Sequence, residues 1–418
     1  MRRIKYKSKA VVLGCNGYTG LSVIRGLGDN GVYVIGSDHS PKEAYATKSK
    51  FCDETLTIPH FSENEAGVVD ELITFAKKEE VIPVLIPCAD PYAELVDKYL
   101  DRLKNHFLLP PINQGLMTKL MNKDSLHTMA LKHDMKVPKK IEVTQENIYE
   151  KVEDEIGFPC LLKPEFSYRF VKVFNKKMFI VNSKEDLEKS LLKAKKEKLD
   201  VFVQQLIPGG DDCMHSFDAY IDKQGRLTHH TTCQKERQYP INFGASVYTR
   251  QRYFPQLYKL GAKFFQDIGY RGFGEIEFKK HQRTGEFYLI EVNVRITNFD
   301  AMLRKVGFNV PFTIYSDMIN KPLPDKHITT STNMYFRYLY RDIIAILEYL
   351  KAGQQSIWNI FKSVAFKKKT YPIWSFSDPL PFLKFGRDML KRVTAKILTF
   401  EKEKANKSDR AKERVPFQ

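Results

Sequence analysis

The stretch 9–38 restricts the fold of this chain more than any other part of the sequence. An apolar, β-prone run is followed at once by a turn with three glycines, then by a segment with helical spacing and by a second apolar run. A third apolar run, 81–86, leads into Pro87. Strands that alternate with helical segments predict a parallel α/β unit. We expect this unit to end near residue 115, after Pro110 and Pro111.

The glycine turn has two interpretations. Gly14, Gly17 and Gly20 would let the backbone turn tightly and place a helix N-terminus against a phosphate group. Asp38, at the end of the second apolar run, would suit a ribose hydroxyl. However, the spacing G-x-x-G-x-x-G differs from that of a dinucleotide-binding turn. We therefore expect the turn to serve packing, with contact to a ligand such as a nicotinamide cofactor as the alternative.

Composition excludes several classes of protein. Of the 418 residues, 43% are hydrophobic and 28% charged, which argues against wholesale disorder. No apolar run approaches the roughly 20 residues that span a bilayer, and the one behind the basic N-terminus is too short for a signal peptide. The six cysteines have no C-x-x-C spacing. We expect a cytoplasmic protein with reduced thiols, built from more than one domain.

The net charge of +17 is concentrated at the C-terminal end, where residues 325–418 carry 19 Lys and Arg against nine Asp and Glu. This favours a local anionic partner over a nucleic acid: a nucleotide, a phosphorylated metabolite or an acidic membrane. Within 381–400, apolar residues recur at helical spacing among the basic ones: Phe382, Phe385, Met389, Val393, Ile397 and Phe400. We expect this stripe to pack on the protein itself, with an anionic membrane as the alternative.

The stretches 274–278 and 286–293 predict a β-hairpin. In the first, Glu275 and Glu277 alternate with apolar residues and therefore point to one face. In the second, polar residues spaced by two likewise project from one face and continue just past the strand: Glu291, Asn293 and Arg295.

These polar residues suit a magnesium site. Glu277, Glu291 and Asn293 supply hard oxygen ligands, and Arg295 can hold phosphate oxygens or an acyl phosphate. The alternative is a solvated face of the hairpin. Asn beside Glu inside an apolar strand is unusual for a β-strand, which favours a function. Lys163, at the end of another apolar strand, is a candidate phosphate ligand.

The order of five motifs resembles that of the ATP-grasp enzymes, over about residues 10–325. The sequence looks most like the carboxylate–amine ligase branch that includes D-aspartate ligases, and the segment 375–381 is also similar to that branch. The motifs are Lys123 at a helix start, Phe158-Pro-Cys-Leu-Leu-Lys163-Pro, Val203-Gln-Gln-Leu-Ile-Pro-Gly209, Gly274-Glu-Ile-Glu277-Phe and Leu289-Ile-Glu291-Val-Asn293-Val-Arg295.

The resemblance implies ATP and Mg²⁺ as cofactors, with Mn²⁺ as an alternative metal, and it implies a role for each matching residue. The ATP phosphates would contact Lys123, Lys163 and either Lys177 or Lys176. The adenine hinge would include Gln204, Gln205 and Ile207, and the ribose would bind Asp212, with Asp211 as the alternative. The metal ligands would be Glu277, Glu291 and Asn293. Arg295 would stabilise the transferred phosphoryl group, which makes Arg295 and Lys163 the catalytic candidates. The carboxylate substrate would face Arg237, Gly244 and Ser246, with Arg250 and Arg252 as weaker candidates.

Two departures from the family pattern stand out. Val294 replaces a proline that is not a ligand, so the change is tolerable. The stretch 164–170 lacks the glycine-rich phosphate flap of many family members. Ser167 and Arg169 are candidates for covering the γ-phosphate in its place.

We therefore predict an α/β protein with three parts: a Rossmann-like domain (1–115), a two-lobed ATP-grasp body (116–325) and a basic helical extension (326–418). The predicted activity joins a small-molecule carboxylate, such as D-aspartate, to an amine, such as a cell-wall precursor, through an acyl phosphate. The partners would be these small molecules, a second copy of the chain, and an anionic membrane at 381–400. The rival functions are a nucleotide-binding oxidoreductase or epimerase, and a membrane-associated nucleotide-binding protein without turnover.

Overall fold

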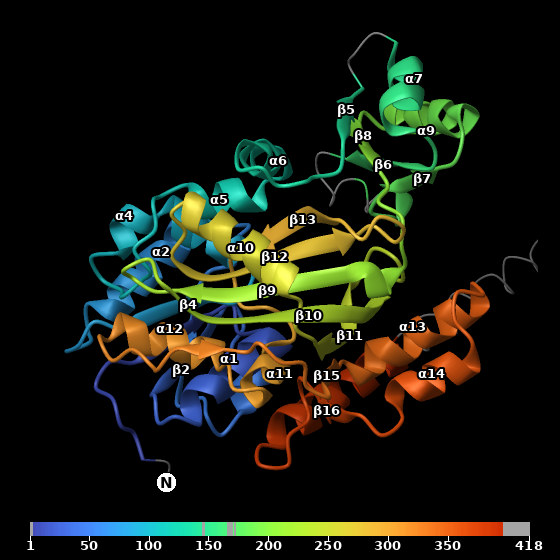
Figure 1. The fold of residues 1–418 in the computed structure, drawn as a ribbon. Coiled ribbons are helices and arrows are strands. Elements are labelled where there is room, and N and C mark those ends of the chain that lie inside the picture. Colours follow the sequence, from blue (N-terminus) through green and yellow to red (C-terminus); the bar gives the residue numbers. More distant parts are fainter. Residues whose placement is uncertain (1–2, 144–146, 165–169, 171–172, 396–418) are drawn as a thin grey trace, which may run out of the picture.

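The computed structural model describes residues 3–143, 147–164, 170 and 173–395. The chain forms three β-sheets with helices packed on them (Figure 1). The first sheet is parallel, has the strand order β3-β2-β1-β4, and is the α/β unit that the sequence predicts. Its strands are β1 (Ala10–Leu13), β2 (Val34–Asp38), β3 (Glu54–Thr57) and β4 (Val84–Pro87).

Helices cover both faces of this first sheet, because the side chains of a strand alternate between its faces. Ala10 and Val12 pack with α1 and α12, whereas Val11 and Leu13 pack with α2 and α3. The N-terminal sheet thus shares a core with a helix from much later in the chain. The helices of this part are α1 (Tyr18–Gly28), η1 (Ala46–Lys48), α2 (Glu65–Ala76), α3 (Asp90–Lys98), α4 (Leu100–Leu103) and α12 (Val310–Met318).

The second sheet has eight strands in the order β13-β12-β9-β10-β11-β15-β16, with β14 beside β10. Helix α10 (Pro255–Asp267) covers one face of it through a core of aromatic and aliphatic side chains. The strands are β9 (Met214–Ile221), β10 (Leu227–Tyr239), β11 (Ala245–Gln251), β12 (Gly272–Lys280), β13 (Phe287–Asn293), β14 (Lys326–His327), β15 (Met334–Arg337) and β16 (Lys368–Thr370).

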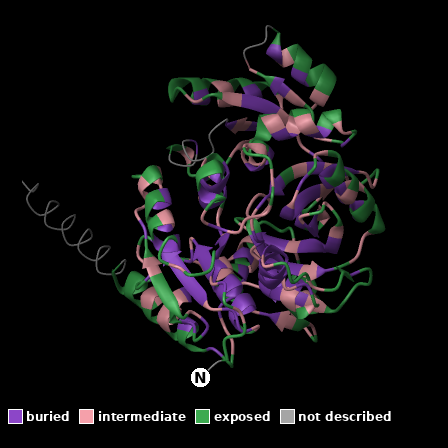
Figure 2. Cartoon of the chain, turned by 90° about the vertical axis from the view of Figure 1, so that its left-hand side faces the viewer, coloured by how far each residue is buried: buried purple, intermediate pink, exposed green. Residues whose placement is uncertain are grey.

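The third sheet is small and antiparallel, with the order β5-β8-β6-β7. It stands with its helices above the second sheet in Figure 1, and Figure 2 shows that fewer of its residues are buried. Asn122 caps the helix that leads towards this sheet by accepting hydrogen bonds from the backbone N–H of Asp124 and Ser125. The elements are α5 (Leu116–Met121), α6 (Lys123–Lys132), β5 (Lys140–Glu142), α7 (Ile148–Lys151), η2 (Val152–Ile156), β6 (Cys160–Pro164), β7 (Phe179–Val181), α9 (Lys184–Lys196), β8 (Val201–Gln205) and η3 (Asp211–Cys213).

The C-terminal part is helical, as predicted, but it also adds β15 and β16 to the edge of the second sheet. Its helices are α13 (Leu339–Lys351), α14 (Ile357–Val364) and a helical stretch over 380–395, and α11 (Asp300–Lys305) precedes them. The start of the last helix packs on the protein, since the ring of Phe385 meets that of Tyr45 and the ring of Phe382 meets that of Trp374. The predicted stripe positions Ile397 and Phe400 lie outside the described residues. None of the helices in the described ranges is long and apolar enough to cross a membrane.

Candidate active site

The predicted hairpin is formed by β12 and β13, and its register brings the polar residues together. Glu275 pairs with Asn293, and Glu277 pairs with Glu291. Ile276 and Phe278 point into the apolar core, so the two glutamates lie on the opposite face of the strand, as their alternation predicts.

Most of the polar residues on this face of the hairpin are buried. The alternative prediction, a face exposed to solvent, is therefore wrong for all of them except Glu291. Glu275 is 2% exposed, Glu277 is 7% exposed and Asn293 is 9% exposed, whereas the side chain of Glu291 is exposed. The amide Nδ2 of Asn293 donates to Glu275 Oε2 at 3.2 Å and to Glu291 Oε1 at 3.4 Å. Asn293 therefore connects the buried carboxylate to the exposed one.

A lysine that the sequence did not single out balances the charge of this row. Lys235 lies on β10, and its Nζ donates to Glu277 Oε2 at 2.6 Å. Burial on its own lowers the pKa of Lys235, but the carboxylates of Glu277, Glu291 and Glu275 outweigh burial and raise it. Lys235 is thus a permanent cation under the carboxylates. The signal in the sequence is a lysine in the interior of a long strand.

A further buried carboxylate, that of Asp218, lies beside Glu275 of this row. Asp218 on β9 pairs in register with Glu275, and one oxygen of each, Asp218 Oδ1 and Glu275 Oε1, has no hydrogen-bond partner within the described part of the chain. Burial raises the pKa of both groups; the charge of Asp218 also raises the pKa of Glu275, and the charge of Glu277 raises the pKa of Asp218. The two acids therefore favour a state with at least one proton.

Arg295 connects this site to the N-terminal part of the chain, through hydrogen bonds to Asp90. Its Nε donates to Asp90 Oδ1 at 2.8 Å and its Nη2 to Asp90 Oδ2 at 3.3 Å. Asp90 is the first residue of α3, just past the carboxyl end of β4. The side chain of Arg295 remains 21% exposed, so its guanidinium is oriented by Asp90 and still accessible.

The third sheet contributes cations. The Nζ of Lys163 donates to Gln204 Oε1 at 2.6 Å, from one strand to its neighbour. The pKa of Lys163 is lowered to about 8, mainly by burial and also by the charges of Lys123 and Lys177, while the charge of Glu291 raises it. The electrostatic interactions show that these three predicted phosphate ligands and one predicted metal ligand lie close enough to affect one another.

The remaining predicted nucleotide contacts line the connection from β8 to β9. Ile207 is buried, while Gln205 accepts from the backbone N–H of Lys139 through Oε1. The carboxylate of Asp211 is buried and accepts from Gln238, from the backbone N–H of Asn242 and from Tyr349. Asp212 is exposed, which makes it the better placed of the two ribose candidates.

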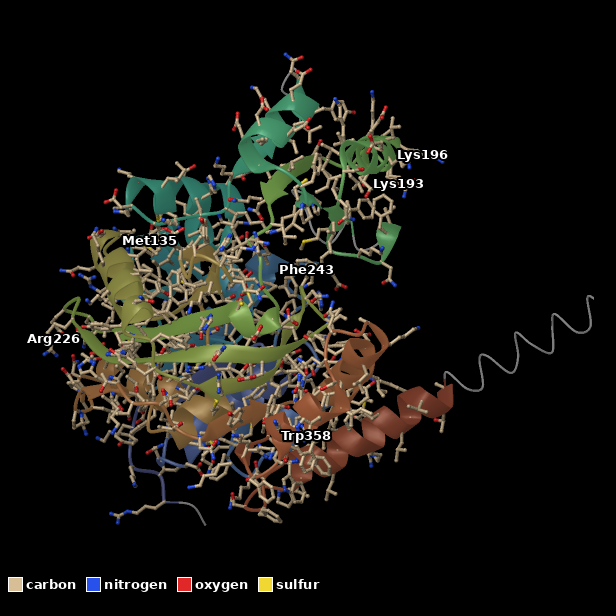
Figure 3. The ribbon with its side chains drawn as sticks, turned by 45° about the vertical axis from the view of Figure 1, so that its right-hand side comes forward. Met135, Lys193, Lys196, Arg226, Phe243 and Trp358 are labelled. Carbon is tan, nitrogen blue, oxygen red and sulfur yellow. The ribbon has the colours of Figure 1, made fainter. Side chains whose placement is uncertain are left out.

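Lys177 donates to the backbone oxygen of Phe243, a residue that lies between the third sheet and the body (Figure 3).

The structure does not bring the predicted substrate residues to an open surface. Arg237 is 1% exposed, forms an ion pair through Nε and Nη2 with Asp342, and donates from Nη1 to Ser363. Ser246 is buried and hydrogen-bonded to Thr249. Both side chains have partners within the protein, and their contact with a carboxylate substrate stays a prediction.

Gly244 and the weaker candidates also have structural partners. A Cβ on Gly244 would lie 2.0 Å from the backbone carbon of Tyr239, so packing alone requires glycine there. Arg250 and Arg252 both donate to Gln234 Oε1. The flap residues Ser167 and Arg169 lie outside the described residues.

The glycine turn follows its packing interpretation. Gly14 has a φ of +81°, and a Cβ there would lie 2.4 Å from the Tyr92 ring. Gly20 packs on the backbone of Cys15. The carboxylate of Asp38 accepts from the backbone N–H of Asn16 and of His39, so it is occupied within its own loop.

The donor set fits a magnesium ion. The described residues contain no group of three or more His, Cys, Asp or Glu side chains that could hold a metal. Two carboxylates and an amide are nevertheless enough for Mg²⁺ that also binds phosphate oxygens. Glu277 and Glu291 stand directly opposite each other, and like charges in this position repel unless a cation lies between or beside them. Lys235 supplies one positive charge, and Glu291 remains accessible for a metal.

Comparison with known proteins gives consistent results. Residues 122–310 match the family model described as the carbamoyl-phosphate synthase L chain, ATP binding domain. A D-aspartate ligase of Enterococcus faecium is 30% identical over 250 residues, which cover 57% of this chain and 59% of that enzyme. The match thus spans less than two thirds of that relative.

Solved structures with the same fold have low sequence identity. The biotin carboxylase domain of 2-oxoglutarate carboxylase from Hydrogenobacter thermophilus has a TM-score of 0.61 and 16% identity, covering 79% of this chain and 74% of that one. That domain was solved as a dimer with ADP, magnesium and bicarbonate. N5-carboxyaminoimidazole synthetase from Staphylococcus aureus has a TM-score of 0.58 and 14% identity, covering 78% and 81%. These likenesses confirm the predicted fold class.

Proposed function

We propose that this chain is an ATP-grasp enzyme, an ATP-dependent ligase that joins a carboxylate to an amine, and the family match over residues 122–310 supports this. The observation that carries the proposal is the meeting of two sets of charges from different sheets. Lys163 supplies a cation from the third sheet, together with Lys123 at the start of α6 and Lys177 just before β7, and Glu291 supplies a carboxylate from the second sheet. Cations for phosphate oxygens opposite carboxylates for a metal are what phosphoryl transfer requires.

The proposed reaction follows from the chemistry of a carboxylate. A carboxylate is a poor electrophile, because its leaving group would be oxide. Transfer of the γ-phosphoryl group of ATP to a carboxylate oxygen gives an acyl phosphate and ADP. The amine then attacks the acyl carbon, the C–N bond forms, phosphate leaves, and the amine nitrogen loses a proton.

The chain's own residues would supply positions and charges. Mg²⁺, when bound, would neutralise phosphate charge. Glu277, Glu291 and Asn293 would hold it, with Lys235 donating a hydrogen bond to Glu277 at the base of the site. Arg295, oriented by Asp90, would neutralise the transferred phosphoryl group.

We further propose D-aspartate as the first carboxylate to test and a cell-wall precursor as the source of the amine. The 30% identity with a D-aspartate ligase supports this choice. A homodimer is the oligomeric state we expect, by analogy with the dimeric carboxylase domain.

Thermal stabilisation by Mg²⁺·ATP tests the proposal first, since a ligand that binds the folded state raises its apparent stability. We expect a shift with wild-type protein that Glu291→Gln reduces strongly. Glu286→Gln is the matched control, because Glu286 lies just before the same strand but pairs with Lys136 on the surface. ADP release with D-aspartate against L-aspartate then tests the substrate. No shift at millimolar Mg²⁺·ATP, or a shift with NAD(H) in its place, would contradict the proposal.

A further inference from the structure

A groove of about 1190 Å³ lies between the N-terminal part of the chain and the helical stretch 380–395. One wall consists of residues 39–48, which follow β2, and the other consists of the helical stretch. This volume is large enough for a metabolite of substantial size. None of the residues assigned above to the nucleotide, the metal or the phosphoryl group lines it.

The groove is strongly basic on both walls. Its lining contains two acidic side chains, Glu43 and Asp388, and six basic ones: Lys42, Lys48, Lys384, Arg387, Lys391 and Arg392. Lys384 pairs with Asp388 at 2.7 Å. Over the described ranges, no carboxylate forms an ion pair with the other five cations. A recess lined by charges of one sign attracts ligands of the opposite sign.

The groove is held in shape by buried contacts. Arg25 of α1 pairs with Asp378 at 2.9 Å, and both side chains are almost fully buried. This pair fixes the chain just before the helical stretch begins. Phe385 then packs edge-on against Tyr45 at a centroid distance of 5.4 Å, which joins the two walls at the base of the groove. The cations therefore stand on a fixed scaffold.

The inner end of the groove adjoins the candidate active site. Asn16, from the glycine turn, and Tyr338 line it. The ring of Tyr338 packs on that of Tyr18 at a centroid distance of 4.9 Å and an interplanar angle of 50°. The hydroxyl of Tyr18 is hydrogen-bonded to Asn298, and the charge of Arg295 is close enough to affect its pKa. Open α/β sheets bind ligands beyond the carboxyl ends of their strands, and the groove lies beyond the ends of β1 and β2.

We propose that this groove binds a substrate of the ligase through phosphate groups on that substrate. The step from binding site to substrate site rests on the proposed function. Cations on both walls favour a ligand with at least two phosphate groups, and the aromatic base suits an organic portion between or beside them. The phosphorylated end would lie on the helical stretch, while the reacting end would reach Arg295 past Tyr18.

Phosphate groups of this kind occur in soluble metabolites and in lipid headgroups, so the test has two arms. The first measures calorimetric binding of fructose 1,6-bisphosphate, and the second measures sedimentation with vesicles of phosphatidylglycerol and phosphatidylcholine. Both use the full chain and the variant Arg387→Glu/Lys391→Glu/Arg392→Glu, whose three positions are exposed. The matched control is Lys195→Glu/Lys196→Glu at the exposed end of α9; Figure 3 shows Lys196 beside the third sheet, at the opposite end of the view from the C-terminal helices.

We expect binding in one arm that weakens at least tenfold in the triple variant, stays unchanged in the control and falls as salt is raised. The arm that responds identifies the source of the phosphate groups. Binding should persist in Glu291→Gln and in the presence of saturating Mg²⁺·ATP. Absence of binding in both arms, equal loss in the control, or loss in Glu291→Gln would overturn the proposal.

The outcomes separate this inference from the proposed function. Stabilisation by Mg²⁺·ATP without binding in either arm would contradict the proposed groove site and remain consistent with the proposed ligase. Binding in the groove without stabilisation by Mg²⁺·ATP would remove the ligase and leave an anion site of another purpose.

Discussion

The Nζ of Lys235 lies 2.6 Å from Oε2 of Glu277, and both side chains are almost fully enclosed. The two residues lie on different strands, β10 and β12, with β9 between them. Glu277 therefore has a fixed counter-charge, and its burial, which raises its pKa, is opposed by Lys235. This ion pair fixes the position of Glu277, one of the predicted metal ligands, beside Glu291.

Removal of one partner should destabilise the protein strongly. Lys235→Met leaves Glu277 buried without its cation, which should lower the free energy of unfolding by about 3–5 kcal/mol. Urea denaturation measures this change. The double variant Lys235→Met/Glu277→Gln should recover most of the loss, because no uncompensated charge then remains. A Lys235→Met protein as stable as the wild type would show that the pair contributes nothing.

Nucleotide affinity should fall at high pH. The folded pKa of Lys163 is lowered to about 8 by burial and by neighbouring cations. The ammonium is therefore present below pH 8 and lost above it, and phosphate oxygens bind the charged form. Affinity for Mg²⁺·ATP should decrease by up to tenfold per pH unit above about 8. Calorimetry from pH 6.5 to 9.5 measures this, and Lys163→Met should bind weakly without that slope.

The lowered pKa of Lys163 also predicts a pH dependence for the stability of the ligand-free protein, and this dependence has the opposite sign to that of nucleotide affinity. The unfolded chain holds the Lys163 proton up to its ordinary pKa of 10.5, whereas the folded protein releases it near 8. The contribution of this residue to the stability of the ligand-free protein should therefore rise with pH between these values. Comparison of wild type with Lys163→Met in urea at pH 7.5 and 9.5 isolates it; equal differences at the two pH values would contradict the lowered pKa.

Arg295→Met should reduce turnover far more than nucleotide binding. If Arg295 neutralises the transferred phosphoryl group, its loss should lower the rate of ADP release by about 100-fold or more. The affinity for Mg²⁺·ATP should change little, since the lysines remain. Asp90→Asn should have a smaller effect, because it loosens Arg295 without removing it. A large loss of affinity with an unchanged rate would place Arg295 among the nucleotide contacts.

The link between the two ends of the chain should be important for stability. Asp378 accepts from Arg25, from Ser49 and from the backbone N–H of Lys50, all within the buried interior or at its edge. Asp378→Ala should lower the free energy of unfolding by about 3–5 kcal/mol. Asp388→Asn, which breaks a more exposed pair with Lys384, should lower it by no more than about 1 kcal/mol. Similar losses in the two variants would show that burial does not distinguish the pairs.

Much of the candidate site could be predicted from the sequence, because it depends on local periodicity. The alternation in 274–278 and 286–293 puts Glu277, Glu291 and Asn293 on one face of any hairpin formed by these stretches. The strand–turn–helix order in 9–38 likewise requires a parallel sheet, and Lys163 has to lie near the end of its strand.

The sequence determined these strands, their faces and the chemistry that they present, because each follows from backbone geometry over a few residues. The tertiary structure decided which charges are paired. Arg237 meets Asp342, Arg295 meets Asp90, and Lys235 meets Glu277. The partners are 42 to 205 residues apart, and whether a charge is buried against a partner or open to a ligand depends on packing between sheets. The basic groove has the same origin, since its two walls become neighbours only when the C-terminal helix packs on the N-terminal part of the chain.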